Sequence, residues 1–490
     1  MARSTSGARD GIVSTGIAGL DDVLGGGLPR GRTYLLQGQP GTGKTTLGLQ
    51  FLLAGAARGE KVVYLTLSQT AAELRAIAES HRFELDRLEI VEMAALGEAT
   101  ELAQVQTVLR TADVELEALS ERVEALLDRA RPDRLVYDSL IEVLLMSDSE
   151  LRFRHEVLRL RDFLSRTSTT SLIVDTVRSG DEKAAIAALV HGVLRLEWSL
   201  PQFGIAHRRI AVTKLRGQRF LEGFHDMTIE TGGVEVYPRI VPRAGISRRE
   251  RKIVRSGIDA LDELTGGGLE QGTVCLIAGH SGVGKSTLAT AFARAATRDR
   301  RRAALFLFEE IPEIYLRRAR ELDLDLEDET AGPRIHIEAF NPAEIVPGKL
   351  YRQIESLVNA GTDMIVIDSI TGFFSALPSG EDVLVQFHAL LGHLARRNVL
   401  VVLVLNMHGL MDQFSRPDFD LSFISDTIIL LRQFDAGSMI RRTISVVKKR
   451  YGPHETEVRE YRITQTGLDV LPIDRSIDLR EQKSLGSVGN

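Results

Sequence analysis

Cysteine, tryptophan, proline and long apolar runs are scarce in this 490-residue chain, which contains one cysteine, one tryptophan and 14 prolines. The single cysteine, Cys275, has no partner in the chain, which excludes internal disulfide bonds and a cysteine-based metal site and indicates a reducing cytoplasm. The sequence lacks an uninterrupted apolar stretch of about eighteen residues, and residues 1–10 lack the hydrophobic region of a signal peptide. We therefore expect neither membrane insertion nor secretion.

The chain does contain enough apolar sequence to bury large cores. Hydrophobic residues make up 43% and charged residues 26%, as is usual for globular proteins. At about 150 residues per domain, the length predicts two to four domains, and two large ones fit best. The formal net charge of −6 argues weakly against a surface devoted to nucleic acid, although a ring can enclose a basic channel.

An internal repeat organises the chain. The segment 14–28 (STGIAGLDDVLGGGL) recurs as 255–269 (RSGIDALDELTGGGL), and Gly38 and Lys44 recur 241 positions later as Gly279 and Lys285. The two segments align without a gap, which indicates a duplicated domain. We interpret the charged residues 248–255 as a solvated linker rather than a nucleic-acid contact. The predicted boundaries are a tail at 1–13, a first domain at 14–245, a linker at 246–255, a second domain at 256–472 and a tail at 473–490.

Each copy alternates apolar, strand-like runs with longer amphipathic stretches, the pattern of an α/β domain in which helices cover both faces of a mostly parallel sheet. Further strand-like runs close each copy, and this tail of strands resembles the RecA-like fold more than a plain mononucleotide-binding fold. The predicted strands are 32–37, 62–67, 88–92, 134–138, 171–175, 193–198 and 208–214 in the first copy, and 274–278, 303–308, 335–338, 364–368, 399–406, 427–433 and 442–448 in the second.

Two glycine-rich segments between a predicted strand and a predicted helix match the complete P-loop pattern: 38–45 (GQPGTGKT) and 279–286 (GHSGVGKS). Glycines let the backbone N–H groups turn toward phosphate oxygens, and the lysine reaches the β- and γ-phosphates. A glycine-rich turn without a ligand is disfavoured because the same context occurs twice. The predicted ATP-binding residues are Gly38, Gly41, Thr42, Gly43, Lys44, Thr45 and Thr46 in the first copy, and Gly279, Ser281, Gly282, Val283, Gly284, Lys285, Ser286 and Thr287 in the second.

A second acidic element is expected to orient the water shell of Mg²⁺, which the hydroxyls of Thr45 and Ser286 would bind. Each copy has an apolar strand that ends in aspartate, at Asp138 and Asp368. Either could be an ordinary turn residue, but the P-loop upstream favours a Walker B role for both. Asn406, at the end of the next strand, is equally compatible with a γ-phosphate sensor and a simple turn residue.

ATP hydrolysis also requires a group that positions and deprotonates water. The second copy has two carboxylates at the end of a strand, Glu309 and Glu310, which we predict to be catalytic together with Lys285 and Lys44; Glu309 is also a candidate Mg²⁺ ligand. The aligned residues of the first copy are Ser68 and Gln69, which cannot act as carboxylate bases. We therefore predict slow turnover at the first site, although Gln69 could orient a water molecule.

These motifs resemble the KaiC-type ATPases, the family of the cyanobacterial circadian clock protein, within the wider RecA/DnaB superfamily. The resemblance covers nearly the whole chain and rests on the tandem lead-in segments, both P-loops, the glutamate pair and basic motifs near the domain ends. It implies a double-ring hexamer in which cations reach the ATP of the neighbouring subunit, and it leaves a KaiB-like or other signalling protein as a partner. The residues matching those cations are Lys214, Arg216, Lys448, Arg450 and His454; solvated charges on an edge strand are the alternative interpretation.

Clock-type members of that family also phosphorylate an adjacent serine and threonine in the second domain. Here Ser422 matches the first acceptor, whereas Phe423 stands at the threonine position and has no hydroxyl. A two-site phosphorylation cycle is therefore not expected. Glu309 could serve as the base for Ser422 or as the activator of water, and the sequence leaves both open.

The sequence thus predicts a ring-forming ATPase that signals or keeps time, with possible serine autokinase activity in its second domain. A nucleic-acid-dependent motor or recombinase is the competing class, because the same core occurs in DnaB-type helicases; DNA-stimulated, salt-sensitive ATPase activity would distinguish it. A scaffold that merely holds ATP at both sites is disfavoured by Glu309 and Glu310.

Overall fold

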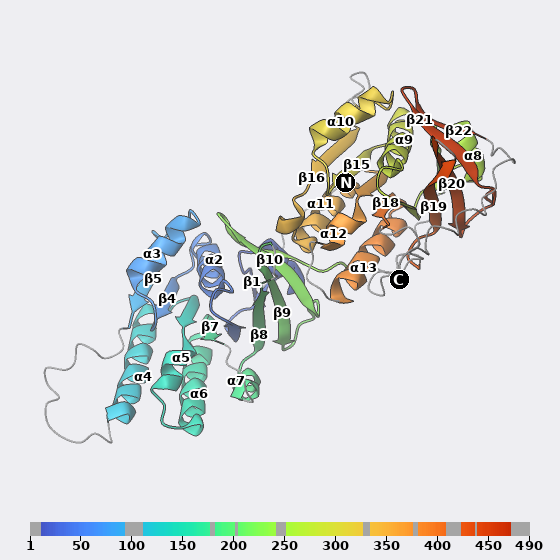
Figure 1. Ribbon diagram of the computed structural model, residues 1–490. Coiled ribbons are helices and arrows are strands. Elements are labelled where there is room, and N and C mark those ends of the chain that lie inside the picture. Colours follow the sequence, from blue (N-terminus) through green and yellow to red (C-terminus); the bar gives the residue numbers. More distant parts are fainter. Residues whose placement is uncertain are drawn as a thin grey trace, which may run out of the picture. The chain divides into compact units, whose positions relative to one another are not determined.

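The computed structural model describes residues 11–93, 111–176, 182–200, 204–241, 251–326, 334–375, 381–407, 423–436 and 439–471. The chain divides into two compact units, one formed by residues 1–201 and 206–239 and the other by residues 202–205 and 240–490. Each unit contains a nine-stranded, mostly parallel sheet with helices packed against it (Figure 1). The predicted α/β fold with two tandem RecA-like domains is confirmed.

The first unit has the strand order β11-β10-β9-β8-β3-β7-β6-β4-β5. Pairing is parallel from β8 to β5 and antiparallel from β8 outward to β11. The strands are β3 (Thr33–Gly38), β4 (Val62–Thr66), β5 (Leu88–Glu92), β6 (Arg134–Asp138), β7 (Thr170–Thr176), β8 (Gly192–Ser199), β9 (His207–Leu215), β10 (Phe224–Glu230) and β11 (Gly233–Tyr237), with a separate pair β1 (Ile12–Val13) and β2 (Leu28–Pro29). The helices are α1 (Ala18–Val23), α2 (Lys44–Ala56), α3 (Ala71–Ser80), α4 (Thr111–Ala130), α5 (Leu140–Leu145), α6 (Glu150–Thr167) and α7 (Glu182–Leu189).

The second unit repeats this topology with the order β16-β15-β17-β18-β14-β19-β20-β21-β22. Its strands are β14 (Val274–Gly279), β15 (Ala303–Leu307), β16 (Ile335–Ala339), β17 (Met364–Asp368), β18 (Leu400–Asn406), β19 (Thr427–Ala436), β20 (Met439–Lys449), β21 (Arg459–Thr464) and β22 (Gly467–Leu471), with a separate pair β12 (Ile253–Val254) and β13 (Leu269–Glu270). Its helices are α8 (Asp259–Leu264), α9 (Lys285–Arg298), the 3₁₀ turn Pro342–Glu344, α10 (Pro312–Glu321), α11 (Pro347–Asn359), α12 (Ile370–Ser375) and α13 (Glu381–Arg396).

Both faces of each sheet are buried, because the central strands are apolar on both sides. On β3, Tyr34 and Leu36 pack into the cluster that includes α2 and α3, whereas Leu35 packs into the cluster that includes α4, α5 and α6. Successive strand residues point to opposite faces, so an uninterrupted apolar strand requires a helical layer on each side. The carboxyl ends of the parallel strands are therefore left as the place where polar side chains can gather.

A buried arginine joins several elements of the first unit. Arg134, at the start of β6, is fully buried; it forms an ion pair with Glu60 and donates to the carbonyl oxygens of Ser14 (2.7 Å) and Phe51 (2.9 Å). In the second unit, Met364 occupies the same place at the start of β17. We expect Arg134→Met to lower the free energy of unfolding of the first unit by about 1–3 kcal/mol, because two carbonyl oxygens lose a donor and Glu60 keeps only Arg30 as a partner. Chemical denaturation checks this, and Arg134→Met with Glu60→Gln should recover part of the loss.

His225 on β10 is expected to make the first unit sensitive to acid. Its side chain is buried, Nε2 lies 3.0 Å from the Leu221 carbonyl oxygen and Nδ1 accepts from the Arg239 N–H at 3.0 Å, so the ring is neutral with its proton on Nε2. Burial lowers the pKa of His225 below the ordinary 6.5. The unfolded chain therefore binds more protons as the pH falls through that ordinary value, and stability present above it is lost below it.

We expect the free energy of unfolding of the first unit to fall between pH 7 and pH 5, with His225 contributing a slope of up to about 1.4 kcal/mol per pH unit. His225→Gln should cost about 1–3 kcal/mol at pH 7 because buried hydrogen bonds are lost, yet its stability should fall less steeply toward pH 5. Denaturant titrations at a series of pH values give both slopes, and equal slopes would contradict this role.

Candidate nucleotide-binding sites

Both P-loops are built alike, with a left-handed glycine at the start of the following helix. Gly43 (φ 96°) precedes α2 and Gly284 (φ 98°) precedes α9. A Cβ atom on either would lie 2.5 Å from an isoleucine Cδ1, that of Ile229 on β10 or of Ile463 on β21. The left-handed backbone would strain any other residue, and an added Cβ would also displace the isoleucine, so glycine is favoured at both positions. The outer antiparallel strands thus press against the predicted phosphate-binding loops.

The P-loop lysines point back into their own loops. Lys44 Nζ donates to the carbonyl oxygens of Gly38 (2.7 Å) and Gln39 (2.9 Å), and Lys285 Nζ donates to that of His280 (2.6 Å). Burial lowers the pKa of both lysines, opposed by Asp138 and Asp175 in the first site and by Asp368 and Glu309 in the second. Each ammonium group therefore lies among the acceptors and carboxylates where the sequence predicts phosphate binding.

The predicted Walker B aspartates lie beside the P-loops, but their partners differ. Asp138, at the end of β6, accepts a hydrogen bond of 2.6 Å from the Tyr64 hydroxyl at Oδ2. Asp368, at the end of β17, lies near the side chain of Ser286. Burial raises the pKa of both aspartates. The serine–aspartate pair is the arrangement that holds Mg²⁺ in P-loop enzymes.

Glu309 is held by two side chains at the end of β15. The Ser369 hydroxyl donates to Glu309 Oε1, and Asn406 Nδ2 lies 3.0 Å from each carboxylate oxygen. The side chain of Asn406 is thus directed at Glu309, which neither sequence interpretation of Asn406 foresaw. Ser369, which directly follows Asp368, was also missed, because nothing in the local sequence distinguishes it from an ordinary turn serine.

Glu310 has a different partner. Its Oε2 forms an ion pair of 2.8 Å with Arg318 Nη1 on α10, and the Arg318 guanidinium also lies over the ring of Tyr315, 5.0 Å from its centre. This ion pair ties the Glu310 carboxylate to α10, whereas the Glu309 carboxylate acts electrostatically on Lys285 of the P-loop. The geometry therefore separates the two predicted catalytic glutamates and favours Glu309 as the base.

The first unit has no carboxylate at the position of Glu309. Ser68 is exposed there, and Gln69 Oε1 is buried without a hydrogen-bond partner among the residues that the structure describes. A different carboxylate, Asp175 at the end of β7, accepts from Gln37 Nε2 at 3.2 Å and acts electrostatically on Lys44. The two sites are thus alike in their loops and unlike where a water molecule would be activated.

The basic residues near the domain ends contact their own unit. Lys214 Nζ lies 2.5 Å from the Ala187 carbonyl oxygen and Arg216 Nη2 lies 3.0 Å from that of Ala188, so both groups sit at the C-terminal end of α7, where cations are favoured. Arg450 donates to the Phe423 carbonyl oxygen at 2.7 Å and pairs with Asp426. Lys448 lies on β20 and His454 in the segment that follows it. Ser422 lies outside the described residues.

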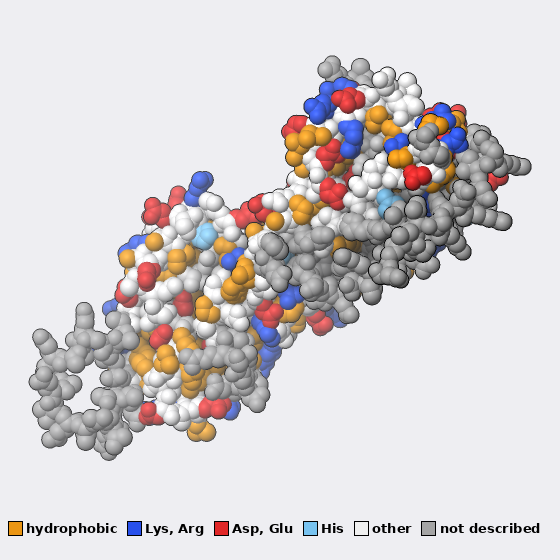
Figure 2. All heavy atoms as spheres, in the orientation of Figure 1, with side chains coloured by type: hydrophobic (Ala, Val, Ile, Leu, Met, Phe, Trp, Pro, Cys, Tyr) orange, Lys and Arg blue, Asp and Glu red, His pale blue; other side chains and the backbone are white. Residues whose placement is uncertain are grey.

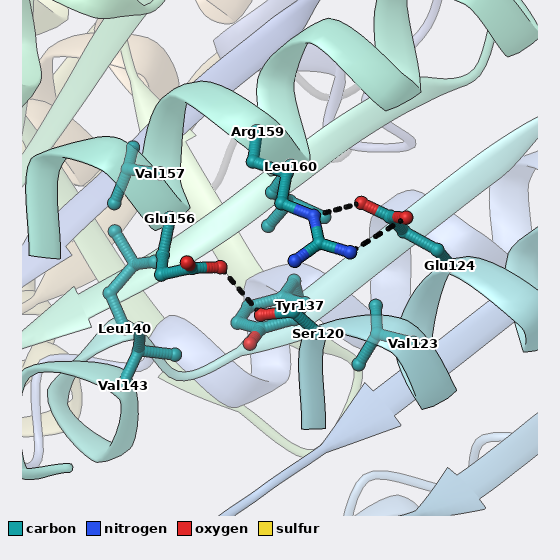
Figure 3. Close-up of a pocket in the computed structure, with 10 residues that line it drawn as sticks. All are labelled: Ser120, Val123, Glu124, Tyr137, Leu140, Val143, Glu156, Val157, Arg159 and Leu160. Carbon is teal, nitrogen blue, oxygen red and sulfur yellow. Dashed lines mark hydrogen bonds and ion pairs between the residues drawn. The ribbon is translucent and has the colours of Figure 1, made fainter. Parts of the chain in front are cut away.

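A small cavity in the first unit lies away from the P-loop, among α4, α5, α6 and β6 (Figure 3). Ser120 donates to Glu156 at 2.7 Å and Arg159 pairs with Glu124 at 2.7 Å across it. Its volume is about 20 Å³, which suits a water molecule and not a nucleotide.

The residues of the two loops suit a Mg²⁺ ion that is shared with substrate phosphates better than a metal ion that is held by side chains alone. Within the described ranges no group of three or more histidine, cysteine, aspartate or glutamate side chains is placed to hold a metal ion. Mg²⁺ binds in P-loop proteins through one hydroxyl, water and substrate phosphates, so it needs no such cluster. In the same ranges, no helix combines the length and the apolar character needed to cross a membrane.

Sequence comparison with known proteins identifies the family of this chain. The model of the KaiC ATPase family matches residues 13–240 and 254–475. The chain is 28% identical to the circadian clock oscillator protein KaiC of Parathermosynechococcus lividus, over 93% of this chain and 84% of the relative. It is 29% identical to the KaiC of Synechococcus elongatus, over 93% and 88% of the two chains. The chain therefore belongs to the KaiC family of ATPases.

Proposed function

We propose that this KaiC-family ATPase hydrolyses Mg²⁺-bound ATP in its second unit and retains ATP in its first. The observation that carries the proposal is the Glu309 carboxylate, held by Ser369 and Asn406 beside the P-loop, where the first unit has Ser68 and Gln69. The second unit has a carboxylate positioned as a base, and the first has none at the matching position. We propose domain boundaries at 14–245 and 256–472, and a cytoplasmic location.

In the second unit, the N–H groups of loop 279–286 and Lys285 bind the phosphates, and Ser286 and Asp368 would hold Mg²⁺. The metal ion would supply positive charge against the β- and γ-phosphate oxygens. Glu309 accepts the proton of the attacking water while Asn406 and Ser369 fix its orientation. The role of Glu310 is then to anchor α10 through Arg318 rather than to take the proton.

In the first unit, loop 38–45 with Lys44, Thr45 and Asp138 binds ATP in the same way. Gln69 has no proton acceptor in the position of Glu309, so bound ATP persists. Asp175 is the rival base at this site, since it lies close enough to act on Lys44. Measurable hydrolysis confined to the first unit would favour Asp175 over our proposal, and Asp175→Asn would identify it.

For assembly, we propose a double-ring hexamer in which Lys214 and Arg216, and Lys448, Arg450 and His454, contact the nucleotide of the neighbouring subunit. The family membership supports this, as does the position of these cations at the ends of β9 and β20. Light scattering with and without ATP tests it: Arg450→Ala should lower both the hexamer fraction and the turnover, and an ATPase that works fully as a monomer would contradict it.

We further propose that Ser422 accepts a phosphoryl group from ATP and that a KaiB-like protein is a partner, both on the strength of the family alone. Incubation with γ-labelled ATP and Mg²⁺, followed by mass spectrometry, locates any phosphoresidue. Label on Ser422 that disappears in Ser422→Ala supports an autokinase. Release of phosphate with unlabelled protein would leave an ATPase without one.

Phosphate release measured with and without DNA distinguishes the proposed ATPase from a nucleic-acid motor. Acidic and basic side chains are interspersed over the described part of the face drawn in Figure 2, and the net charge is −6, so no feature drawn there favours a nucleic-acid track. We expect the rate of phosphate release to be unchanged by added DNA. A salt-sensitive stimulation by DNA would support the motor instead.

A further inference from the structure

The first unit carries a buried tyrosine on its Walker B aspartate. Tyr64 lies on β4 with its ring fully buried, and its hydroxyl donates to Asp138 Oδ2 at 2.6 Å. The Thr45 side chain also lies close enough to this phenol to affect its pKa. One hydroxyl thus lies near both side chains that the P-loop pattern assigns to Mg²⁺ at this site.

The second unit has no tyrosine at the matching position. Leu305 stands there on β15, 241 positions after Tyr64, and packs into the apolar core. Asp368 instead lies near Ser286. A buried tyrosine also occurs in this unit, but the hydroxyl of Tyr315 is paired with that of Thr290 at 2.6 Å.

We propose that Tyr64 supplies to Asp138 the hydrogen bond that water bound to Mg²⁺ supplies elsewhere, so that the first site retains ATP with little dependence on Mg²⁺. This rests on the proposed role of the first unit as an ATP-holding site and deepens it. A water bound to the metal ion would compete with the phenol for the Asp138 carboxylate, so binding of the metal and of ATP are less strongly coupled here. At the second site Leu305 has no hydroxyl that could compete for Asp368, so metal and ATP binding are more strongly coupled.

The expected difference in nucleotide Kd ratio follows from the strength of a hydrogen bond to a carboxylate. A hydrogen bond to a buried carboxylate contributes enough to change an equilibrium constant by about tenfold to a hundredfold. We therefore expect the ratio of nucleotide Kd in EDTA to Kd in excess Mg²⁺ to be smaller at the first site than at the second by about tenfold to a hundredfold.

The test uses full-length variants that each retain one P-loop lysine. Lys285→Met leaves the first site intact and Lys44→Met leaves the second. The Kd of a fluorescent, non-hydrolysable ATP analogue is measured for both, in Mg²⁺ and in EDTA. A variant with both Lys285→Met and Tyr64→Phe loses, in addition, only the Tyr64 hydroxyl. Its Kd ratio at the first site should rise toward that of the second site.

Three results are informative. A small ratio for the first site that rises in Tyr64→Phe supports the proposal. Equal ratios at the two sites, or a ratio that Tyr64→Phe leaves unchanged, overturn it, and the comparison of the two lysine variants stands even if Tyr64→Phe fails to fold. If Lys285→Met binds no nucleotide in Mg²⁺ while circular dichroism shows it folded, the proposed ATP-holding role of the first unit fails, and this proposal fails with it for a separate, recognisable reason.

Discussion

Replacing Glu309 by glutamine is expected to lower the steady-state rate of ATP hydrolysis by about 10²- to 10⁴-fold, the usual contribution of a positioned general base. Glutamine keeps the shape of the side chain, and its Oε1 can still accept from Ser369 and Asn406, but it cannot take a proton. Nucleotide affinity should change little, because Glu309 acts on water rather than on the phosphates. Phosphate release under saturating ATP gives the rate, and equilibrium binding gives the affinity.

Glu310→Gln is the matched control for this variant. It removes the same charge one residue away, from a carboxylate that Arg318 already holds. We expect a loss of rate of about tenfold or less, because the change affects the position of α10 rather than the chemistry. If Glu310→Gln abolishes turnover and Glu309→Gln does not, the assignment of the base is reversed.

The second large effect concerns the two P-loop lysines, which are equivalent in sequence and are expected to differ in function. Lys285→Met should lower ATP hydrolysis by about 10²-fold or more, because the γ-phosphate loses a charge that stabilises its transition state. Lys44→Met should leave most of the turnover per assembled ring intact and remove one tightly bound nucleotide per chain. Phosphate release, together with chromatographic measurement of bound nucleotide, distinguishes the two.

Assembly must be measured alongside, since retained ATP can stabilise a ring. If Lys44→Met loses turnover together with its oligomer, activity assayed at a protein concentration that restores the oligomer separates the two causes. A Lys44→Met protein that is fully assembled and has lost turnover would show that the first unit takes part in the chemistry.

Much of the fold and part of the site could be predicted from the sequence, because the relevant signals are local. The P-loop pattern has fixed spacing, and apolar strands that end in Asp138 and Asp368 are visible as short runs. The predicted parallel strands correspond to observed ones within a few residues. These features need no knowledge of distant contacts, and sequence reasoning therefore finds them.

The outer hairpins and the fine structure of the sites could not be predicted. The strands β10–β11 and β21–β22 mix polar and apolar residues, and they are recognisable as strands through pairing with β9 and β20. Tyr64 reaches Asp138 across 74 positions, and Asn406 reaches Glu309 across 97. Such pairs depend on which strands are neighbours in the sheet. A single sequence does not show the order of the strands in a sheet.

We propose that the second unit hydrolyses ATP and the first retains it. Identifying the nucleotide that is bound to the first site alone tests this most directly. Lys285→Met is loaded with ATP in Mg²⁺, freed of unbound nucleotide, and sampled by acid quench over many turnover times of the unmodified protein. The bound nucleotide is expected to remain ATP. Conversion to ADP at a rate close to that of the unmodified protein would contradict it, because the first unit would then hydrolyse ATP without a base in the position of Glu309.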